Sequence, residues 1–395
     1  RLGILDDAAV AIQDGRILDL GPSQKLRQSY SAERELDAGG SVVLPGFVDP
    51  HTHLVWAGDR AHEFEQRVGG VPYLDILKAG GGILHTVRKT RAASVDRLVT
   101  ESRGRLQRML ALGTTTAEAK SGYGLETTAE MRQLEAIIEL DDEGIVDLAP
   151  TLLGGHAVPP EFDGDPDGYV AYVLEDMLPG VESWWRARYP KRDLPFFDVF
   201  CEEGAFDVDQ SRKMLEAAAD RGFRLKLHAD EFQGLGGTRL AVELGAVSVD
   251  HLVETPETDM KALGKSVTVG VTLPCTPFGL GLERYTPAHE FLSAGAVLAL
   301  ATDLNPGTAW CESMQFAIAV ACRQLHLTPA QAIAAATINA AAAIGRADRI
   351  GSLEPGKAAD LLILAVDDYR HLGYRFGGNL VDKVIKGGEV VIEGD

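Results

Sequence analysis

Two histidines separated by one residue, His51 and His53, end the run LPGFVDPHTH. In an extended strand, side chains at positions i and i+2 point to the same face, so both imidazoles can bind one metal ion. The H-x-H spacing alone is weak evidence, because two ordinary surface or core histidines would show it too. Here the pair follows an apolar run, the break at Pro45–Gly46 and the polar Asp49, which favours a pair of metal ligands.

A metal ion needs more than two protein ligands, and His228 and Asp303 could supply the others. Three imidazoles and one carboxylate suit Zn²⁺, and also Fe²⁺ or Mn²⁺. Taken alone, His228 could instead be a hydrogen-bonded core histidine and Asp303 a helix N-cap. A bound ion would lower the pKa of a water from near 16 to about 7, which makes a nucleophile available at neutral pH.

Hydrolysis by an activated water also requires proton transfer. Glu231 lies three residues after His228 in the run HADEF, and His251 lies in VDHLVE. Either residue, or Asp303, could take the proton of the water, and Glu231 or His251 could deliver one to a departing nitrogen. The sequence leaves this division open, and a salt bridge at the rim is the alternative role for Glu231 and His251.

A second metal ion is the alternative that Lys120 raises, because related chemistry uses a lysine carboxylated by CO₂ to bridge two metals. Lys120 ends the second strand-like run, and no spare histidine pair accompanies it. An ion pair, for example with Glu118, is the simpler role. We therefore expect one ion per chain.

Candidate substrate contacts lie in the loops after these runs, where binding residues are commonly found. Arg60 could hold a carboxylate by a two-pronged bond, although it could also pair with Glu63. Tyr123 offers a hydroxyl in the loop SGYG, or it could only pack, and His156 in GGHAVP could polarise a carbonyl oxygen. The remaining candidates follow Asp303 and are Asn305, Gly307 and Thr308.

Eight apolar, strand-like runs alternate with helix-like stretches in the middle of the chain, which predicts a (β/α)₈ barrel. The runs span residues 41–53, 112–120, 145–157, 196–204, 223–231, 246–252, 267–275 and 297–303. The candidate residues end or follow these runs, and barrel active sites lie at the C-terminal strand ends. This concurrence is stronger evidence than any single motif.

The two ends of the chain both show short alternating apolar stretches with Gly and Asp turns, which predicts strands and hairpins, including one at KGGEV. We therefore expect a small β-sandwich domain formed from residues 1–45 and 350–395, around a barrel of residues 46–349. The acidic, Pro-containing segment 161–195 is interpreted as an insertion before the fourth strand. Two Ala-rich helices are predicted after the eighth strand.

Composition limits the possible partners. Asp and Glu outnumber Lys and Arg by 58 to 38, a net charge of −20, which opposes binding to nucleic acid and to anionic membranes. We find no apolar run long enough for a membrane span and no signal-peptide pattern. Four cysteines without a C-x-x-C pair favour a reducing compartment, so we expect a cytoplasmic protein. The sequence begins at Arg1, and we expect the natural N-terminus to precede it.

Several of these runs together resemble the amidohydrolase superfamily. The shared pieces are LPGFVDPHTH, HADEF, VDHLVE, ATDLNPG and GSLEPGKAADLLIL. Further pieces are similar to the members that open the ring of 4-imidazolone-5-propanoate in histidine breakdown. They are HLVWAGDRAHEFEQR, YLDILKAGGGI, TTAEAKSGYGL, LGGHAVP and TDLNPGT, so the resemblance covers nearly the whole chain.

The resemblance implies a homodimer that hydrolyses this small anionic substrate to N-formimidoyl-L-glutamate with one Zn²⁺ or iron ion. It implies metal ligation by His51, His53, His228 and Asp303. It implies substrate contacts by Arg60, Tyr123, His156, Glu231, Asn305, Gly307 and Thr308. The net negative charge of the chain makes a local cation such as Arg60 necessary for an anionic substrate.

Two other functions compete with this one. A mononuclear deaminase of a purine or pyrimidine ring would share the metal ligands and the H-x-x-E pair, but has less use for Arg60. A barrel that has lost its metal and serves as an assembly protein is the non-enzymatic alternative, and the complete ligand set argues against it.

Overall fold

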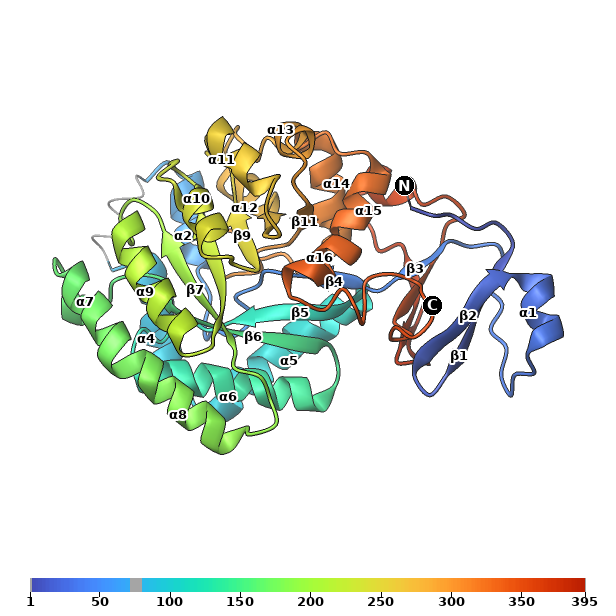
Figure 1. The fold of residues 1–395 in the computed structure, drawn as a ribbon, viewed down its shortest axis with the longest axis horizontal. Helices are drawn as coiled ribbons and strands as arrows, with labels where there is room; N and C mark the ends of the chain where they lie inside the picture. The colour runs from blue at the N-terminus through green and yellow to red at the C-terminus, as the bar shows by residue number, and fades with distance from the viewer. Residues whose placement is uncertain (1, 72–79, 395) are drawn as a thin grey trace.

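The computed structural model describes residues 2–71 and 80–394, so most of the run YLDILKAGGGI lies outside the described residues. Eight parallel strands form one sheet whose order follows the sequence, and helices surround it (Figure 1). The strands are β4 Phe47–Asp49, β5 Thr114–Lys120, β6 Asp147–Gly155, β7 Phe196–Cys201, β8 Arg224–Ala229, β9 Ser248–His251, β10 Val269–Thr272 and β11 Leu298–Leu300. All eight fall within the predicted runs, and the predicted barrel is confirmed.

The barrel closes directly after its first and last strands. Thr52 and Leu304 form an isolated parallel bridge. The amide of His53 donates to the carbonyl of Leu304 at 2.9 Å, and the amide of Asp303 donates to the carbonyl of His51 at 3.2 Å. The segments that carry the H-x-H pair and Asp303 are therefore joined by backbone hydrogen bonds.

Local signals in the sequence fix where two of the helices begin. Asp207 and Gln210 form a reciprocal capping box at the start of α9, and Thr328 and Gln331 form another at α15. The helices before β7 are α1 Ser23–Ser29, α2 Ala61–Val68, α4 Ile83–Arg91, α5 Val95–Ala111, α6 Thr127–Glu143, η1 Pro160–Phe162, α7 Pro166–Tyr172, η2 Val173–Met177 and α8 Leu178–Arg188. Those after β7 are α9 Val208–Asp220, α10 Gly237–Glu243, α11 Glu257–Leu263, α12 Cys275–Leu280, α13 Ala288–Ser293, α14 Met314–Gln324, α15 Pro329–Ala335, α16 Ile338–Ala343 and α17 His371–Tyr374.

The interpretation of residues 161–195 as an insertion is wrong. The segment contains η1, α7, the π-helical turn η2 and α8, and it forms the helical connection between β6 and β7. Asp165 caps α7 and Pro166 occupies its first position. Val170 and Trp185 are buried against the barrel core. Pro166 therefore begins α7 and Pro179 lies in the first turn of α8, directly after the π-helical turn.

The β-rich part draws on both ends of the chain (Figure 1). Its strands are β1 Ala8–Gln13, β2 Arg16–Pro22, β3 Val43–Pro45, β12 Leu361–Leu364, β13 Val381–Lys386 and β14 Glu389–Glu393. β1 pairs with β2, and the other four form an antiparallel sheet in the order β14-β13-β12-β3. Ile17 packs with Leu361, Ile363 and Ile385 in a small shared core. The predicted hairpin turns at Gly387–Gly388, where both φ angles are positive.

A single residue, Gly46, separates the two sheets. The run 41–53 was expected as one strand, but β3 belongs to the small sheet and β4 to the barrel. A Cβ atom at Gly46 would lie 2.2 Å from Oγ1 of Thr115, so the close approach to β5 requires glycine.

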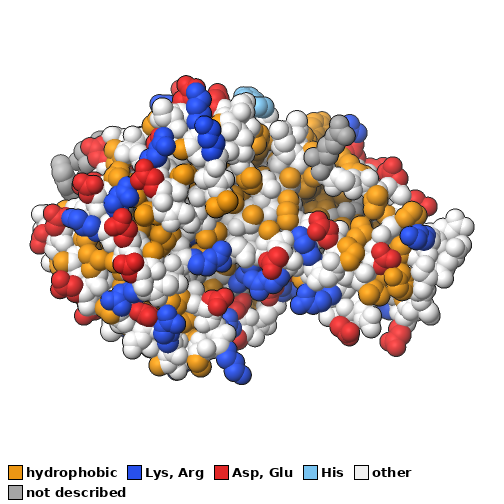
Figure 2. All heavy atoms as spheres, in the orientation of Figure 1, with side chains coloured by type: hydrophobic (Ala, Val, Ile, Leu, Met, Phe, Trp, Pro, Cys, Tyr) orange, Lys and Arg blue, Asp and Glu red, His pale blue; other side chains and the backbone are white. Residues whose placement is uncertain are grey.

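The face of the molecule shown in Figure 2 carries basic and acidic side chains in an interspersed pattern rather than one continuous patch of either sign. Among residues 2–71 and 80–394, no helix combines the length and the apolar character that crossing a membrane would require.

Candidate metal centre and active site

Four side chains from three segments converge at the C-terminal ends of the barrel strands. The ring centroids of His51 and His228 lie 4.4 Å apart, and those of His53 and His228 lie 5.4 Å apart. Oδ1 of Asp303 lies 3.5 Å from Nε2 of His51 and 3.5 Å from Nε2 of His53. The structure therefore brings together all four residues that the sequence proposes as ligands.

The unpartnered atoms of this cluster fit a divalent cation. Nε2 of His51 and Oδ1 of Asp303 are buried and have no hydrogen-bond partner among the described residues. Nε2 of His53 lies 3.4 Å from Nε2 of His228, so two ring nitrogens face each other. Burial lowers the pKa of both His51 and His53 well below the ordinary value, which keeps these imidazoles neutral. Neutral imidazoles and a carboxylate around orphaned lone pairs are the donor set of a metal centre.

Asp303 is held in place from the side opposite the cluster. Thr276 donates its hydroxyl to Oδ2, which leaves Oδ1 directed at the histidines. Burial raises the pKa of Asp303 to about 6, and the hydrogen bond from Thr276 acts in the other direction. Thr276 was not among the predicted site residues.

A second group of potential ligands, His51, Glu118 and Asp250, has donor atoms near enough for another ion. Two ammonium groups already neutralise these carboxylates. Lys120 and Lys226 donate to Glu118 at 2.8 and 2.9 Å and lie 3.7 and 3.9 Å from Asp250. Burial acts to lower the pKa of Lys120, but the charges of the surrounding carboxylates outweigh it and raise that pKa. A lysine held as an ammonium ion cannot take up CO₂, so this arrangement supports a single ion.

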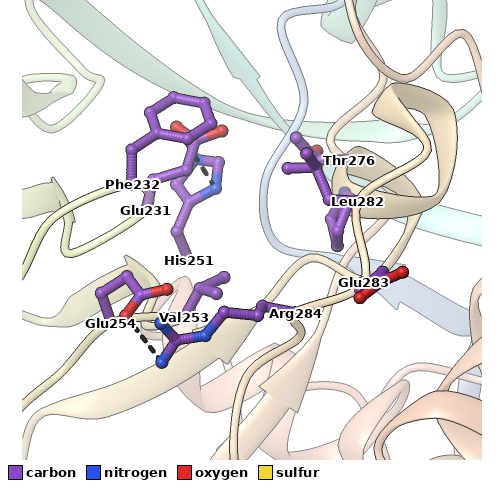
Figure 3. Close-up of a pocket in the computed structure, with 10 residues that line it drawn as sticks. Glu231, Phe232, His251, Val253, Glu254, Thr276, Leu282, Glu283 and Arg284 are labelled. Atoms are coloured by element: carbon purple, nitrogen blue, oxygen red, sulfur yellow. Dashed lines mark ion pairs between the residues drawn. The ribbon is translucent and has the colours of Figure 1, made fainter.

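Glu231 and His251 face each other on the wall of a cavity of about 200 Å³ beside the cluster (Figure 3). Nδ1 of His251 lies 3.7 Å from Oε2 of Glu231, and the ring centroid of His251 lies 5.3 Å from that of His228. Burial raises the pKa of Glu231 and lowers that of His251. The two predicted proton-transfer residues therefore lie next to each other and next to the proposed ligands.

The loop that carries Glu231 is fixed by an acid from the preceding β/α unit. The carboxylate of Glu202 accepts hydrogen bonds from the amides of Phe232 at 2.9 Å and Gln233 at 3.3 Å. Asp230 has a positive φ of 55°. Its Oδ2 accepts hydrogen bonds from two threonine hydroxyls, those of Thr238 and Thr255.

Two of the proposed residues have left-handed backbone conformations, which non-glycine residues rarely adopt. The φ angle is 83° at His251 and 55° at Asp303, and Leu252 follows at 64°. Such strain persists only where the surroundings determine the conformation, and it concentrates at functional sites. Here it turns both side chains into the rim of the barrel.

Tyr123 and His156 form one side of the site. His156 stacks on His53 with a centroid distance of 4.9 Å, and Tyr123 lies 5.3 Å from His156. Nδ1 of His156 lies 2.9 Å from the carbonyl oxygen of Gly122. Because a carbonyl can only accept, Nδ1 must donate, and the neutral ring then offers Nε2 as an acceptor. This geometry favours a contact with a substrate N–H over the expected contact with a carbonyl oxygen.

Arg60 pairs with Glu63, as one of the two interpretations expected. Nε and Nη2 lie 2.9 and 2.7 Å from Oε2 of Glu63. The Arg60 charge still acts on the site, because it is among the influences on the pKa of Tyr123, which burial raises. Its Nη1 lies against Gly307. Arg60 thus stands at the junction of α2 and the loop after β11.

Asn305 shapes the loop after Asp303. Its amide nitrogen donates to the Asp303 carbonyl at 2.7 Å, and its oxygen accepts from the amides of Gly307 and Thr308, both at 2.8 Å. The three predicted residues of this loop are therefore linked to one another, with Asn305 at the centre.

The predicted ion pair of Lys120 with Glu118 is present beneath the cluster, but sequence reasoning missed the two aspartates there. Asp250 lies 2.7 Å from Nδ1 of His51, and Asp198 lies 3.0 Å from Nδ1 of His228. The available signal was a charged residue within an otherwise apolar run, as in FFDVF and VSVDH. Neither residue follows a strand, which is where the candidates were sought.

Comparison with known sequences places this chain in a family. A sequence model of the amidohydrolase family matches residues 42–391. The imidazolonepropionase of Herpetosiphon aurantiacus is 53% identical over 391 residues, which cover 99% of this chain and 91% of that protein. The imidazolonepropionase of Geobacillus kaustophilus is 46% identical over 396 residues, covering 99% of this chain and 91% of that protein.

Solved structures with the same fold include deaminases. A 5-methylcytosine deaminase from Klebsiella pneumoniae, liganded with 5-fluorocytosine, has a TM-score of 0.73 at 17% identity, covering 98% of this chain and 94% of that one. An adenosine deaminase from Xanthomonas campestris with bound zinc has a TM-score of 0.70 at 19% identity, covering 98% and 89%. At these identities the likeness concerns the fold alone.

Proposed function

Because the chain belongs to the amidohydrolase family, and within it to the imidazolonepropionases, we propose that it hydrolyses 4-imidazolone-5-propanoate to N-formimidoyl-L-glutamate in histidine degradation. The observation that carries the proposal is the convergence of His51, His53, His228 and Asp303 beside the Glu231–His251 pair. This arrangement can activate water next to a ring C–N bond and move the proton that the ring opening needs.

The metal centre is assigned to the four converging side chains, with one Zn²⁺ or iron ion per chain. When bound, such a cation acts as a Lewis acid that makes water a nucleophile at neutral pH. The donor set supports either metal. Thr276 keeps Oδ1 of Asp303 directed at the cluster, and burial keeps His51 and His53 neutral.

Glu231 and His251 are assigned the proton transfers. Oε2 of Glu231 and Nδ1 of His251 are 3.7 Å apart, so both groups face the same space, where one would take the proton of the attacking water and the other would deliver a proton to the departing ring nitrogen. Asp303, whose Oδ1 faces the histidines, would be the third acceptor for the proton of the water. The cavity of Figure 3 gives these groups access to a small molecule.

Arg60 is assigned to the propanoate group of the substrate. In a chain with a net charge of −20, an anionic substrate needs a local cation. Glu63 holds one edge of the guanidinium, and Nη1 remains directed toward the Gly307 loop. His156, through Nε2, and Tyr123 are assigned to the polar atoms of the ring, with the loop of Asn305, Gly307 and Thr308 on the other side.

The test is a spectrophotometric assay of imidazolone propanoate loss after chelation and after addition of Zn²⁺ or Fe²⁺ to the chelated protein. We expect activity to vanish on chelation and to return with one ion per chain. H289Q is the control for loss of a histidine outside the cluster, and it should respond to chelation and metal addition as the parent does. His289 contacts the carbonyl of His326 at 3.1 Å. No turnover by the fully loaded protein would overturn the proposal, and activity on a neutral pyrimidine or purine instead would favour a deaminase.

We also propose, from the resemblance to this family, that the protein is a homodimer and works in the cytoplasm. Sedimentation equilibrium of the purified protein tests the first statement, and a monomer throughout the micromolar range would contradict it. Fractionation of the source cells tests the second.

A further inference from the structure

Five charged side chains occupy the interior of the barrel directly beneath the ligand cluster. They are Glu118 and Lys120 on β5, Asp198 on β7, Lys226 on β8 and Asp250 on β9, and all are fully buried. Barrel interiors are usually filled by branched aliphatic residues. Because buried charges are costly unless they are paired and hydrogen-bonded, their presence here requires a specific arrangement.

The two ammonium groups pair these carboxylates across the barrel. Nζ of Lys120 donates to Oε1 of Glu118 at 2.8 Å and to Oδ2 of Asp198 at 2.6 Å. Nζ of Lys226 donates to Oε2 of Glu118 at 2.9 Å. Oδ2 of Asp250 lies 3.7 Å from Lys120 and 3.9 Å from Lys226. Glu118 therefore bridges the two lysines, and Lys120 connects that bridge to both aspartates.

The same aspartate oxygens face two proposed metal ligands. Oδ2 of Asp250 lies 2.7 Å from Nδ1 of His51, and Oδ2 of Asp198 lies 3.0 Å from Nδ1 of His228. At His51 the contact is a hydrogen bond, and because a carboxylate only accepts, Nδ1 donates and the lone pair of the ring is on Nε2. At His228 the carboxylate of Asp198 lies at ion-pair distance from Nδ1 without hydrogen-bond geometry, and its charge beside Nδ1 favours the same tautomer. In both rings Nε2 is the atom that faces the cluster.

The main chain before the H-x-H pair is held by the same network. Lys226 donates to the carbonyl oxygen of Pro50 at 2.9 Å, immediately before His51. The strand alternation places Lys226 and His228 on the same inward side of β8. Lys226 thus fixes the backbone before His51, and His228, two residues after Lys226 on the same strand, is itself a proposed ligand.

We propose that Lys120 and Lys226 are positioning residues, which hold Asp198 and Asp250 so that His228 and His51 present Nε2 to the metal. The inference rests on the ligand set of the proposed function and deepens it, because it assigns the selection of ring tautomer to charges below the site. Both lysines are fully buried, so neither can contact a molecule in the cavity. A purely structural role would affect the stability of the fold without a specific effect on metal affinity.

Lys357 provides the matched control. It is a buried lysine near the small β-rich part, and its Nζ donates to the carbonyl of Ala347 and the hydroxyl of Ser352, both at 2.6 Å. K357M therefore removes an ammonium group and two hydrogen bonds far from the ligand cluster. K120M removes the same group from the network.

The experiment measures the Kd for Zn²⁺ of the full chain, in competition with a chromophoric chelator, and separately the denaturant unfolding of the metal-free protein. We expect K120M and D198N to weaken Zn²⁺ binding by about 10- to 100-fold, the range found for partners of metal-ligating histidines. We expect K226M to act in the same direction. K357M should destabilise the metal-free fold and leave the Kd within about twofold of the parent value, because distant sites without shared partners act independently.

The visible absorption of the Co²⁺-loaded protein gives a second readout. D198N keeps the shape of the side chain and removes its charge, so it decides the question where K120M does not fold. A parent-like Zn²⁺ Kd together with an unchanged Co²⁺ spectrum in D198N would overturn the inference. If these variants lose affinity while the loaded parent fails to turn over imidazolone propanoate, the substrate assignment fails and the positioning role stands.

Discussion

A Cβ atom at Gly307 would lie 2.2 Å from Nη1 of Arg60, so the absence of a side chain at this position gives the guanidinium its place. The carbonyl of Gly307 also accepts a hydrogen bond from Arg67 at 3.2 Å, which ties the same loop to α2. The clash would involve the far end of a flexible side chain, which can swing aside at little cost. A side chain at position 307 should therefore displace the guanidinium of Arg60 and have little effect on the stability of the fold.

The variant G307A tests this dependence. We expect its KM for imidazolone propanoate to rise about tenfold or more, as befits the loss of one charge-assisted hydrogen bond, with little change in Tm. Gly378 is the control, since a Cβ there meets nothing within 4 Å and its backbone needs no glycine. A KM in G307A equal to that of G378A would show that Arg60 does not depend on this contact.

Arg60 itself distinguishes the proposed substrate from a neutral ring. Replacement by Met keeps the apolar stem and removes the guanidinium, so the KM for the propanoate substrate should rise by about 10- to 100-fold. Because the reacting bond lies away from the propanoate, kcat should change less. An unchanged KM in R60M would instead favour the deaminase alternative.

Thr276 should control metal retention through Asp303. T276V keeps the volume and removes the hydroxyl that donates to Oδ2, so Oδ1 loses its fixed direction. We expect Zn²⁺ affinity to fall about 10-fold or more, and T276S, which retains the hydroxyl, to bind almost as the parent does. Metal analysis after dialysis against a weak chelator measures both. Equal metal content in T276V and T276S would contradict the prediction.

His156 should make the metal-free fold sensitive to acid. Burial lowers its pKa to about 3, whereas an unfolded-state imidazole titrates near 6.5. Below pH 6.5 the unfolded chain binds a proton that the folded chain refuses, so this contribution to stability is present above 6.5 and is lost as the pH falls. Relative to H156Q, the parent should lose about 2 kcal/mol more between pH 7.5 and pH 5.

Urea unfolding of both proteins at these two pH values measures that difference. The comparison between variants is needed because burial raises the pKa of Asp49 to about 7 and that of Asp303 to about 6, and raised carboxyl pKa values act in the opposite direction. A difference of zero between parent and H156Q would mean that His156 is accessible to protons in the fold.

The sequence predicts the barrel and its rim well because both follow from local periodicity and one topological rule. Each β/α unit repeats a strand-like run and a helix-like run, and parallel strands in a barrel end at the same rim. Those two facts are enough to expect that His51, His228 and Asp303 meet, although they are far apart in the chain. The helix at residues 166–188 escaped because its acidic exposed face hides the buried positions.

The interior below the rim could not be predicted in the same way. Glu118 and Lys226 are 108 residues apart, and their contact depends on the stagger between strands, which periodicity does not encode. The sequence showed that each is charged, but not that both point inward or that they meet. The same holds for Arg60, whose two expected partners were a carboxylate of the protein and one of the substrate, since the choice depends on how α2 packs.

Only Gly46 separates β3 of the small sheet from β4, the strand that leads to the H-x-H pair. His51 lies two residues beyond β4, so a shift of β3 has almost no chain length in which to dissipate before it reaches the first imidazole. We therefore expect a displacement of the sheet that contains β3 to change the position of His51 through the backbone. Disruption of the small sheet should therefore misalign the imidazole of His51 under conditions in which the barrel is still folded.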